Sequence, residues 1–375
     1  MRAVTQLPLK SSHQTESERH FPRGATQLFR SRDGQPRAVV LLLKSVCCAI
    51  TAKPHAAGAL KLKPLVLIPC TDRKRIRPPE TLLARNLPNG SAVEVAAEWE
   101  ARLSPQCCHA DHSMVYCGRA YQEAATAAKI LSSELVVISA GLGLVRQGHP
   151  IPSYSLTVAP SGEDAILRKI TEGQSGPGVW WRALRASRTA SFGINDLLRE
   201  ASEVLVLISL SASYAKLIDE ELSAVSEEDI GRLRIFGAGI NEHLPRRLSS
   251  SVMPYDMRLN GPNSPISGTM SDFSSRALRH YADCLASGMI EGASPHDDGA
   301  VLSDIMKNWE YREIPVRTRM TDEEVVDFVL DNWSAAGGRS GVSLRLLRDS
   351  GHACEQGRFR DLFKVAKERR LEGMA

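Results

Sequence analysis

Short apolar runs alternate with longer helical stretches between residues 64 and 290. Three runs, at 65–68, 135–138 and 204–208, are continuously apolar, as is typical of strands buried on both faces. A fourth follows at 233–236. Because strands and helices alternate, the pattern predicts an α/β fold with a mostly parallel sheet and flanking helices. The stretches with helical character are 92–103, 119–131, 213–224 and 276–287.

The pattern changes after the α/β region, where the chain reads as three helices. Thr321 and Glu324 form a capping box at the start of the first helix, which ends at the glycine pair 337–338. A short helix at 342–349 and a longer basic helix at 355–370 follow. This order is the outline of a helix-turn-helix. The alternative is a small helical bundle whose cations are simply solvated.

Composition divides the chain into four regions. The first lacks periodicity and is rich in Arg, Ser, Gln and Pro, so it is expected to be disordered. We expect a basic tail at 1–63, an α/β domain at 64–290, a linker at 291–308, and a helix-turn-helix domain that binds nucleic acid at 309–375.

Charge is unevenly spread along the chain, whose formal net charge is +4. Residues 1–63 hold 11 Lys/Arg against 3 Asp/Glu, and residues 339–375 hold 9 against 5. The middle holds the remaining 27 against 35 and is therefore acidic. Contacts with nucleic acid are expected locally rather than along a uniformly basic groove.

Several protein classes are excluded by the sequence. None of the 8 cysteines forms a CxxC pair, and the chain has no clear signal peptide, so reduced thiols in the cytoplasm are expected. No apolar run is long enough to span a membrane. Walker A, GxGxxG, HExxH and GxSxG motifs are missing. The cysteines and histidines at 107–112 match no standard zinc spacing, so we expect neither a metal nor another cofactor.

The predicted strands end in residues suited to a binding site. Cys70, Ser139 and Ser209 follow or end the first three runs, and a Gly-rich segment at 237–241 follows the fourth. In open α/β sheets, ligands bind beyond the carboxyl ends of the strands. We therefore expect these residues to share one rim of the sheet.

Cys70 is the candidate nucleophile of this rim, because cations at 73–77 crowd it and favour a thiolate. A thiolate there is suited to attack an electrophilic carbon such as a nitrile or carbonyl. The alternatives are that Cys70 is a small core residue and that Arg73 and Lys74 bind phosphate. His149 is a candidate base, and the residues proposed to orient a base or sugar are Tyr154, Tyr255 and Asp256.

Four short motifs between 65 and 158 carry a family resemblance. They read LIPCTDRK at 67–74, YCGRAY at 116–121, ISAGLGLV at 138–145 and IPSY at 151–154. This order resembles the DUF6884 group of bacterial and phage proteins and, more distantly, the YaaA (DUF328) peroxide-stress family. The Pro-Cys-x-x-x-Lys piece is similar to a segment of archaeosine synthase.

The resemblance implies an α/β fold and a biology linked to nucleic acid. YaaA-type proteins are associated with DNA binding and oxidative stress, and the archaeosine synthase likeness implies chemistry on a 7-deazaguanine nitrile. Pro69, Cys70 and Lys74 match the archaeosine synthase motif, whereas IRPP at 76–79 departs from the continuation of that motif.

Two functions are consistent with these patterns. The first is an enzyme that acts on a nucleobase or nucleotide, with catalytic residues Cys70, Lys74, Ser139 and Tyr154. The second is a non-catalytic DNA-binding protein of stress response or anti-phage defence. Both have nucleic acid, with DNA expected, as the partner, and neither involves a membrane. The expected nucleic-acid contacts are Arg73, Arg119, Arg358, Arg360, Lys364 and Lys367.

Overall fold

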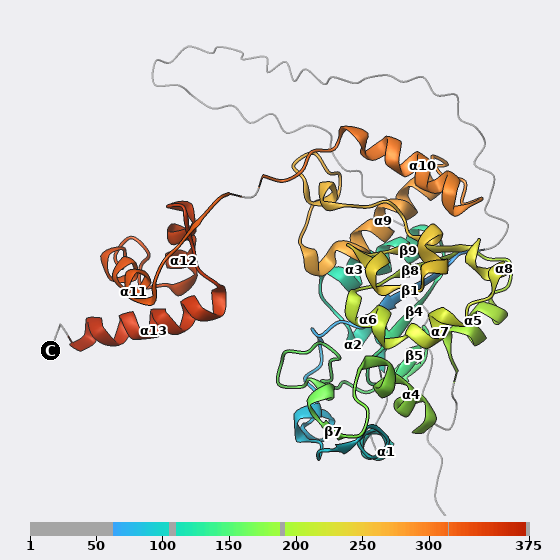
Figure 1. Ribbon diagram of the computed structural model, residues 1–375, viewed down its shortest axis with the longest axis horizontal. Helices are drawn as coiled ribbons and strands as arrows, with labels where there is room; N and C mark the ends of the chain where they lie inside the picture. The colour runs from blue at the N-terminus through green and yellow to red at the C-terminus, as the bar shows by residue number, and fades with distance from the viewer. Residues whose placement is uncertain (1–62, 105–109, 188–191, 314, 373–375) are drawn as a thin grey trace, which may run out of the picture. The chain divides into compact units, whose positions relative to one another are not determined.

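The computed structural model describes residues 63–104, 110–187, 192–313 and 315–372 (Figure 1). The predicted basic tail at 1–63 therefore lies outside the described residues, apart from Lys63.

A five-stranded sheet forms the centre of the α/β body, in the order β5-β4-β1-β8-β9. The four predicted apolar runs are all strands of this sheet and pair in parallel, which confirms the predicted fold class at that level. The edge strand β5 was not predicted and pairs antiparallel with β4. The bounds are β1 Leu65–Pro69, β4 Glu134–Ser139, β5 Gly143–Val145, β8 Val206–Ser209 and β9 Leu233–Phe236.

In the described part of the α/β body, two short strand pairs lie outside this sheet. β2 (Gly90–Ser91) pairs with β7 (Ile170–Glu172), and β3 (Ala110–Asp111) pairs with β6 (Pro150–Ile151).

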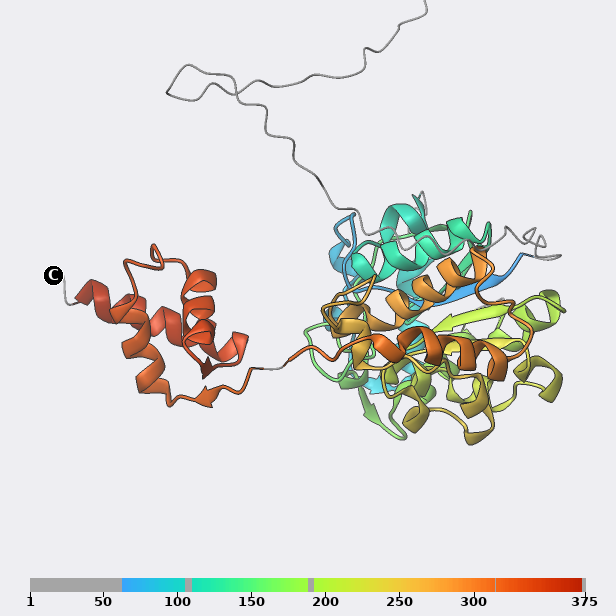
Figure 2. The ribbon, with the colours of Figure 1, turned by 90° about the horizontal axis from the view of Figure 1, so that it is seen from above.

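Helices cover both faces of the main sheet. α3 and α9 pack against each other and against the central strands on one face. Figure 2 shows α3 and the helices between β8 and β9 on opposite sides of the strands. The helices of the α/β body are α1 Ala92–Leu103, α2 His112–Val115, α3 Arg119–Ile130, α4 Pro177–Ser187, α5 Ile194–Glu200, α6 Ala212–Leu217, α7 Asp219–Ser223, α8 Glu227–Ile230, α9 Phe273–Ala286 and α10 Pro295–Ile305.

Local sequence explains the helices that were predicted well. α1 begins where expected because Ser91 accepts a hydrogen bond from the backbone of Glu94, whose carboxylate accepts one in turn from the backbone of Ser91. Its apolar face places Trp99 fully inside the core. The helix expected at 213–224 is divided into α6 and α7, because Ile218 between them leaves the helical conformation.

The stretch 291–308, predicted as a linker, contains helix α10. Ser294 caps the helix and Pro295 occupies its first turn, two features that start helices. Leu302 and Met306 are completely buried in the main hydrophobic core. The prediction of a linker was therefore wrong, because a segment rich in small polar residues still carries one apolar stripe that the body buries.

A buried ion pair also ties α10 to the sheet. Arg234, in β9, donates from Nε to the Asp298 carboxylate at 2.6 Å, and Tyr281 donates to the same oxygen at 2.6 Å. Arg234 and Asp298 are both buried, so each supplies the partner that the other needs away from water.

The C-terminal module consists of three helices and one short strand pair. The helices are α11 Asp322–Asp331, α12 Ser340–Asp349 and α13 Gln356–Glu372, and strand β10 (Thr318–Arg319) pairs in parallel with β11 (His352–Ala353). The capping box of Thr321 and Glu324 is present as predicted. The module has its own hydrophobic cluster, formed mainly by Val325, Val326, Val329, Leu344, Leu347, Phe359, Phe363 and Ala366. That these helices act as a helix-turn-helix stays a prediction.

Within the described parts of the chain, no helix is both long and apolar enough to cross a membrane.

The packing of α10 predicts a contrast between two neighbouring residues. Leu302→Ala should lower the free energy of unfolding by about 2–5 kcal/mol, because the vacated volume lies in a close-packed core. Val301→Ala, at a side chain that is 37% exposed, should change it by less than about 0.5 kcal/mol. Urea denaturation measures both, and equal effects would show that α10 does not belong to the core.

Candidate active site

The carboxyl end of β1 places Cys70 at the rim of the sheet. Its backbone N–H donates to the Ile138 carbonyl at 2.9 Å, so the pairing with β4 continues one residue beyond β1. Ser139, the last residue of β4, is fully buried. The chain passes from β1 to β4 on one side and later to β8 on the other side. Cys70 therefore lies at the topological switch point, where doubly wound sheets leave a crevice.

Tyr154 connects the predicted catalytic residues. Its hydroxyl lies 2.6 Å from Ser139 Oγ, 2.9 Å from the Tyr116 hydroxyl and 3.4 Å from Cys70 Sγ. A phenol hydroxyl has only one proton to donate. In this geometry, Tyr154 donates its hydroxyl proton to the Cys70 sulfur. Ser139 and Tyr116 then donate to Tyr154, and Ser139 itself accepts from the backbone N–H of Leu142 at 3.0 Å.

Close packing fixes the Tyr154 ring. The ring is completely buried and meets Trp99 edge-on, with centroids 6.0 Å apart. Trp99 donates from Nε1 to the Gly141 carbonyl at 2.7 Å. A Cβ at Gly141 would lie 2.8 Å from the Tyr154 ring, so only glycine leaves room there.

Tyr214, from α6, completes the surroundings of the cysteine sulfur. Its hydroxyl lies 2.8 Å from Cys70 Sγ. Because α6 follows β8 and Tyr154 follows β6, two segments far apart in sequence bring hydroxyls to one sulfur. A thiolate at Cys70, which has no proton to donate, would accept from both hydroxyls.

Lys74 lies against the aromatic side of this cluster. Its Nζ is 4.6 Å from the centre of the Tyr154 ring, and it donates to the carbonyls of Thr71 at 3.2 Å and Asp72 at 3.3 Å. Burial lowers the pKa of Lys74, and attraction to Cys70 and Asp72 only partly offsets this. A lysine of lowered pKa holds and releases a proton more readily near neutral pH than a solvated one.

Burial has the opposite consequence for the tyrosines. It raises the pKa of Tyr154, Tyr116 and Tyr214, and the nearby Cys70 adds to the effect. All three therefore stay protonated at neutral pH and remain hydrogen-bond donors. We call Cys70, Lys74, Tyr116, Ser139, Tyr154 and Tyr214 the cysteine cluster.

The predicted cations of the α/β body differ in availability. Arg73 is exposed, and within the described chain no carboxylate pairs with it. Arg119 binds the Ser267 carbonyl at 2.6 Å and lies 3.2 Å from Glu123 and 3.6 Å from Asp272. Arg119 therefore links α3 to the segment before α9, whereas Arg73 remains able to meet an anionic ligand.

The cations of the C-terminal module also fall into two groups. Arg358 donates to the Asp322 carboxylate and to the Met320 carbonyl, so it holds the start of α11 against α13. Arg360, Lys364 and Lys367 are exposed on α13. Lys364 lies 2.9 Å from Asp361 in a solvated pair, which leaves its charge accessible.

Other predicted site residues lie apart from the cysteine cluster. Ser209 ends β8, but its hydroxyl donates to Ser274 at 2.9 Å near the start of α9. The predicted rim is therefore shared by Cys70 and Ser139 through Tyr154, whereas Ser209 makes its hydrogen bonds elsewhere. The proposed base His149 is exposed in a turn. Tyr255 bonds to His280 at 2.7 Å, and Asp256 bonds to Arg258.

Tyr214 and Tyr116 were the residues that the pattern of the chain did not assign to the site. Tyr116 lies within one of the four short motifs, but the motif alone gave it no role. Tyr214 lies five residues after the end of β8, in the first turn of a helix, which is a position that could have identified it.

A metal site is not indicated in the part of the chain that the structure describes, where no three His, Cys, Asp or Glu side chains gather suitably. Cys107, Cys108 and His109 lie outside the described residues.

In comparisons with known proteins, no family model, curated protein or solved structure matches this chain.

The contact between Gly141 and Tyr154 predicts a steric effect. Gly141→Ala should lower the free energy of unfolding by about 1–3 kcal/mol, because the Tyr154 and Trp99 rings are buried and cannot move away freely. Gly299→Ala in α10 is the control. Its new Cβ would make an ordinary contact at 3.9 Å, and alanine favours a helix. Thermal denaturation compares the two, and equal stabilities would show that Tyr154 does not pack on Gly141.

Proposed function

We propose that this protein is a nucleic-acid-associated enzyme that acts on a nucleobase or nucleotide through Cys70. The observation that carries the proposal is the cysteine sulfur itself, half-buried at the switch point of the sheet with two tyrosine hydroxyls within hydrogen-bonding distance of it. Structural cysteines are usually enclosed by apolar groups, whereas reactive ones lie in polar, partly exposed surroundings.

The chemistry of the cluster suits addition to an electrophilic carbon. The Cys70 sulfur would form a bond to the carbon of a nitrile or carbonyl. The π electron pair of that group would move to its nitrogen or oxygen, which would take up the proton lost by the thiol. Tyr154 and Tyr214 would hold the sulfur by hydrogen bonds, and Lys74 would hold the proton in transit. This is the nitrile chemistry that the resemblance to archaeosine synthase implies.

Exposed cations on α13 support the association with nucleic acid. Arg360, Lys364 and Lys367 stand at spacings of four and three residues, so they form one line along the helix. Phe359 and Phe363, on the neighbouring face of the helix, are buried. We propose that this line of cations, together with Arg73 in the α/β body, contacts phosphates, as a helix-turn-helix role of the module would require.

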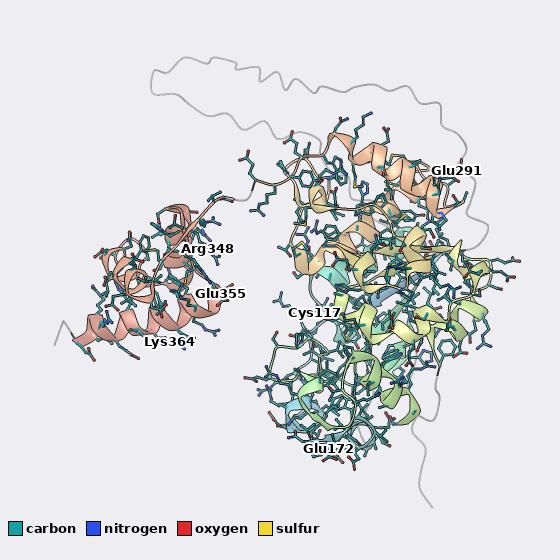
Figure 3. The ribbon with its side chains drawn as sticks, viewed as in Figure 1. Cys117, Glu172, Glu291, Arg348, Glu355 and Lys364 are labelled. Carbon is teal, nitrogen blue, oxygen red and sulfur yellow. The ribbon has the colours of Figure 1, made fainter. Side chains whose placement is uncertain are left out.

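The enzymatic part predicts selective alkylation. At neutral pH, iodoacetamide should modify Cys70 at least about tenfold faster than Cys117, a half-buried cysteine that is labelled in Figure 3. Within the described chain, no hydroxyl makes a hydrogen bond to the Cys117 sulfur. Tyr214→Phe should slow the reaction at Cys70 and leave that at Cys117 unchanged. Peptide mass spectrometry follows each site. If Cys70 reacts no faster than a free cysteine, its role as a nucleophile is rejected. The second function, a non-catalytic DNA-binding protein of stress response or anti-phage defence, is then favoured.

The association with nucleic acid predicts a dependence on salt. Duplex DNA binding should weaken steeply as salt rises, and each of Arg360→Gln, Lys364→Gln and Lys367→Gln should lower the slope of log K against log salt by about 1. Lys307→Gln, at an exposed lysine of the α/β body, is the matched control. Fluorescence anisotropy gives the slopes. Unchanged slopes in all three variants would reject the role of α13.

A further inference from the structure

The C-terminal module contains a pocket that the proposed contacts of α13 do not use. Its volume is about 330 Å³. Four arginines dominate its wall, and the lining residues are Arg317, Arg319, Arg348, Ala353, Cys354, Glu355 and Arg358. Figure 3 labels Arg348 and Glu355 at this pocket and Lys364 further along α13.

The short strand pair explains how two of these arginines reach the pocket. β10 pairs with β11 through Thr318 with His352 and Arg319 with Ala353. Residues two apart in an extended segment point to the same side, and Arg317, just before β10, lines the pocket together with Arg319. A sequence that places arginines on either side of a threonine thus builds one basic wall.

Backbone carbonyls hold three of the arginines in place. Arg317 donates from Nε to the Arg348 carbonyl at 3.0 Å, and Arg348 donates from Nη2 to the Cys354 carbonyl at 3.2 Å. Arg358 donates from Nη2 to the Met320 carbonyl at 2.9 Å. A guanidinium has five N–H donors, so each retains donors that these contacts do not use.

Positive charge exceeds negative charge at the pocket. Arg358 is paired with Asp322, but within the described chain no carboxylate pairs with Arg317, Arg319 or Arg348. Glu355 is the acidic residue of the wall, and its carboxylate accepts from the backbone N–H groups of Gly357 and Arg358, both at 2.8 Å. These hydrogen bonds lower the pKa of Glu355, so it remains ionised and satisfies the start of α13. The three arginines without a carboxylate partner are left for a ligand.

We infer that this pocket binds a phosphate group, with Arg317, Arg319 and Arg348 as its main donors. Guanidinium groups match the oxygens of phosphate in charge and geometry. Arg317 and Arg348 are already oriented by backbone carbonyls, so they lose little freedom on binding. Nucleic acid is the carrier of this phosphate, a step that rests on the proposed function. The module would then hold one backbone phosphate in the pocket while the α13 cations contact others.

The test compares two arginines of the same module in the full-length protein. The Arg319 side chain is exposed and makes no hydrogen bond or ion pair within the described chain, so Arg319→Gln should leave the fold intact. It should weaken binding of a short labelled duplex about tenfold, as expected for one charge-assisted contact. Arg345→Gln, at an exposed arginine of α12 outside the pocket, should change affinity less than about twofold. Arg317→Gln provides a second pocket variant.

A calorimetric titration with adenosine 5′-monophosphate, with adenosine as its control, identifies the source of the phosphate. If the duplex binds and depends on Arg319, nucleic acid is the carrier. If only the monophosphate binds, and Arg319→Gln weakens its binding, the pocket is a phosphate site for a free nucleotide. The proposed association with nucleic acid is then rejected. The pocket is overturned if duplex binding depends on the α13 cations but not on Arg319 or Arg317. It is also overturned if Arg345→Gln weakens binding as much as Arg319→Gln does, because only overall charge would then matter.

Discussion

The burial of β1 between β4 and β8 is the constraint on which the candidate site depends. With a parallel neighbour on each edge, the backbone of β1 is paired on both sides, so it cannot shift its register without breaking hydrogen bonds to both neighbours. Its carboxyl end is therefore fixed, and Cys70 with it. The two neighbours of β1, β4 and β8, are far apart in the sequence. The segments that follow β4 and β8 can therefore meet at the carboxyl end of β1. Tyr154 and Tyr214 reach the same sulfur for that reason.

A second constraint arises from hydroxyl groups buried away from water. Tyr154, Tyr116 and Ser139 are fully buried, and a buried hydroxyl without a partner is costly. Their hydrogen bonds satisfy one another in a chain that runs from the backbone of Leu142 to the Cys70 sulfur. The same burial keeps the tyrosines protonated and makes Lys74 release its proton more readily. Packing and candidate chemistry are thus two consequences of one arrangement.

The C-terminal module uses its charged residues in two ways. Arg358 is held by Asp322 and by the backbone, so it contributes to the module's own structure as well as to the pocket wall. Arg360 and Lys367 point to solvent and contribute little to stability. Counting cations along the helix cannot separate these roles, because the difference depends on which face α11 covers.

The elements whose signals are local could be predicted from the amino-acid sequence. Short apolar runs identified the four parallel strands, and a capping box identified the start of α11. The sequence also singled out Cys70, Lys74, Ser139 and Tyr154, because strand ends and short motifs are visible without knowing which strands are neighbours. The strand order, the edge strand β5 and the burial of α10 by a single apolar stripe became visible only in the folded structure. The same is true of the contact between the Tyr214 hydroxyl and the Cys70 sulfur, and of the hydrogen bond from Ser209 to Ser274 in α9. These outcomes depend on pairing and packing between segments that are distant in the sequence. The hydrophobic periodicity of each segment does not predict which distant segments pair or pack together.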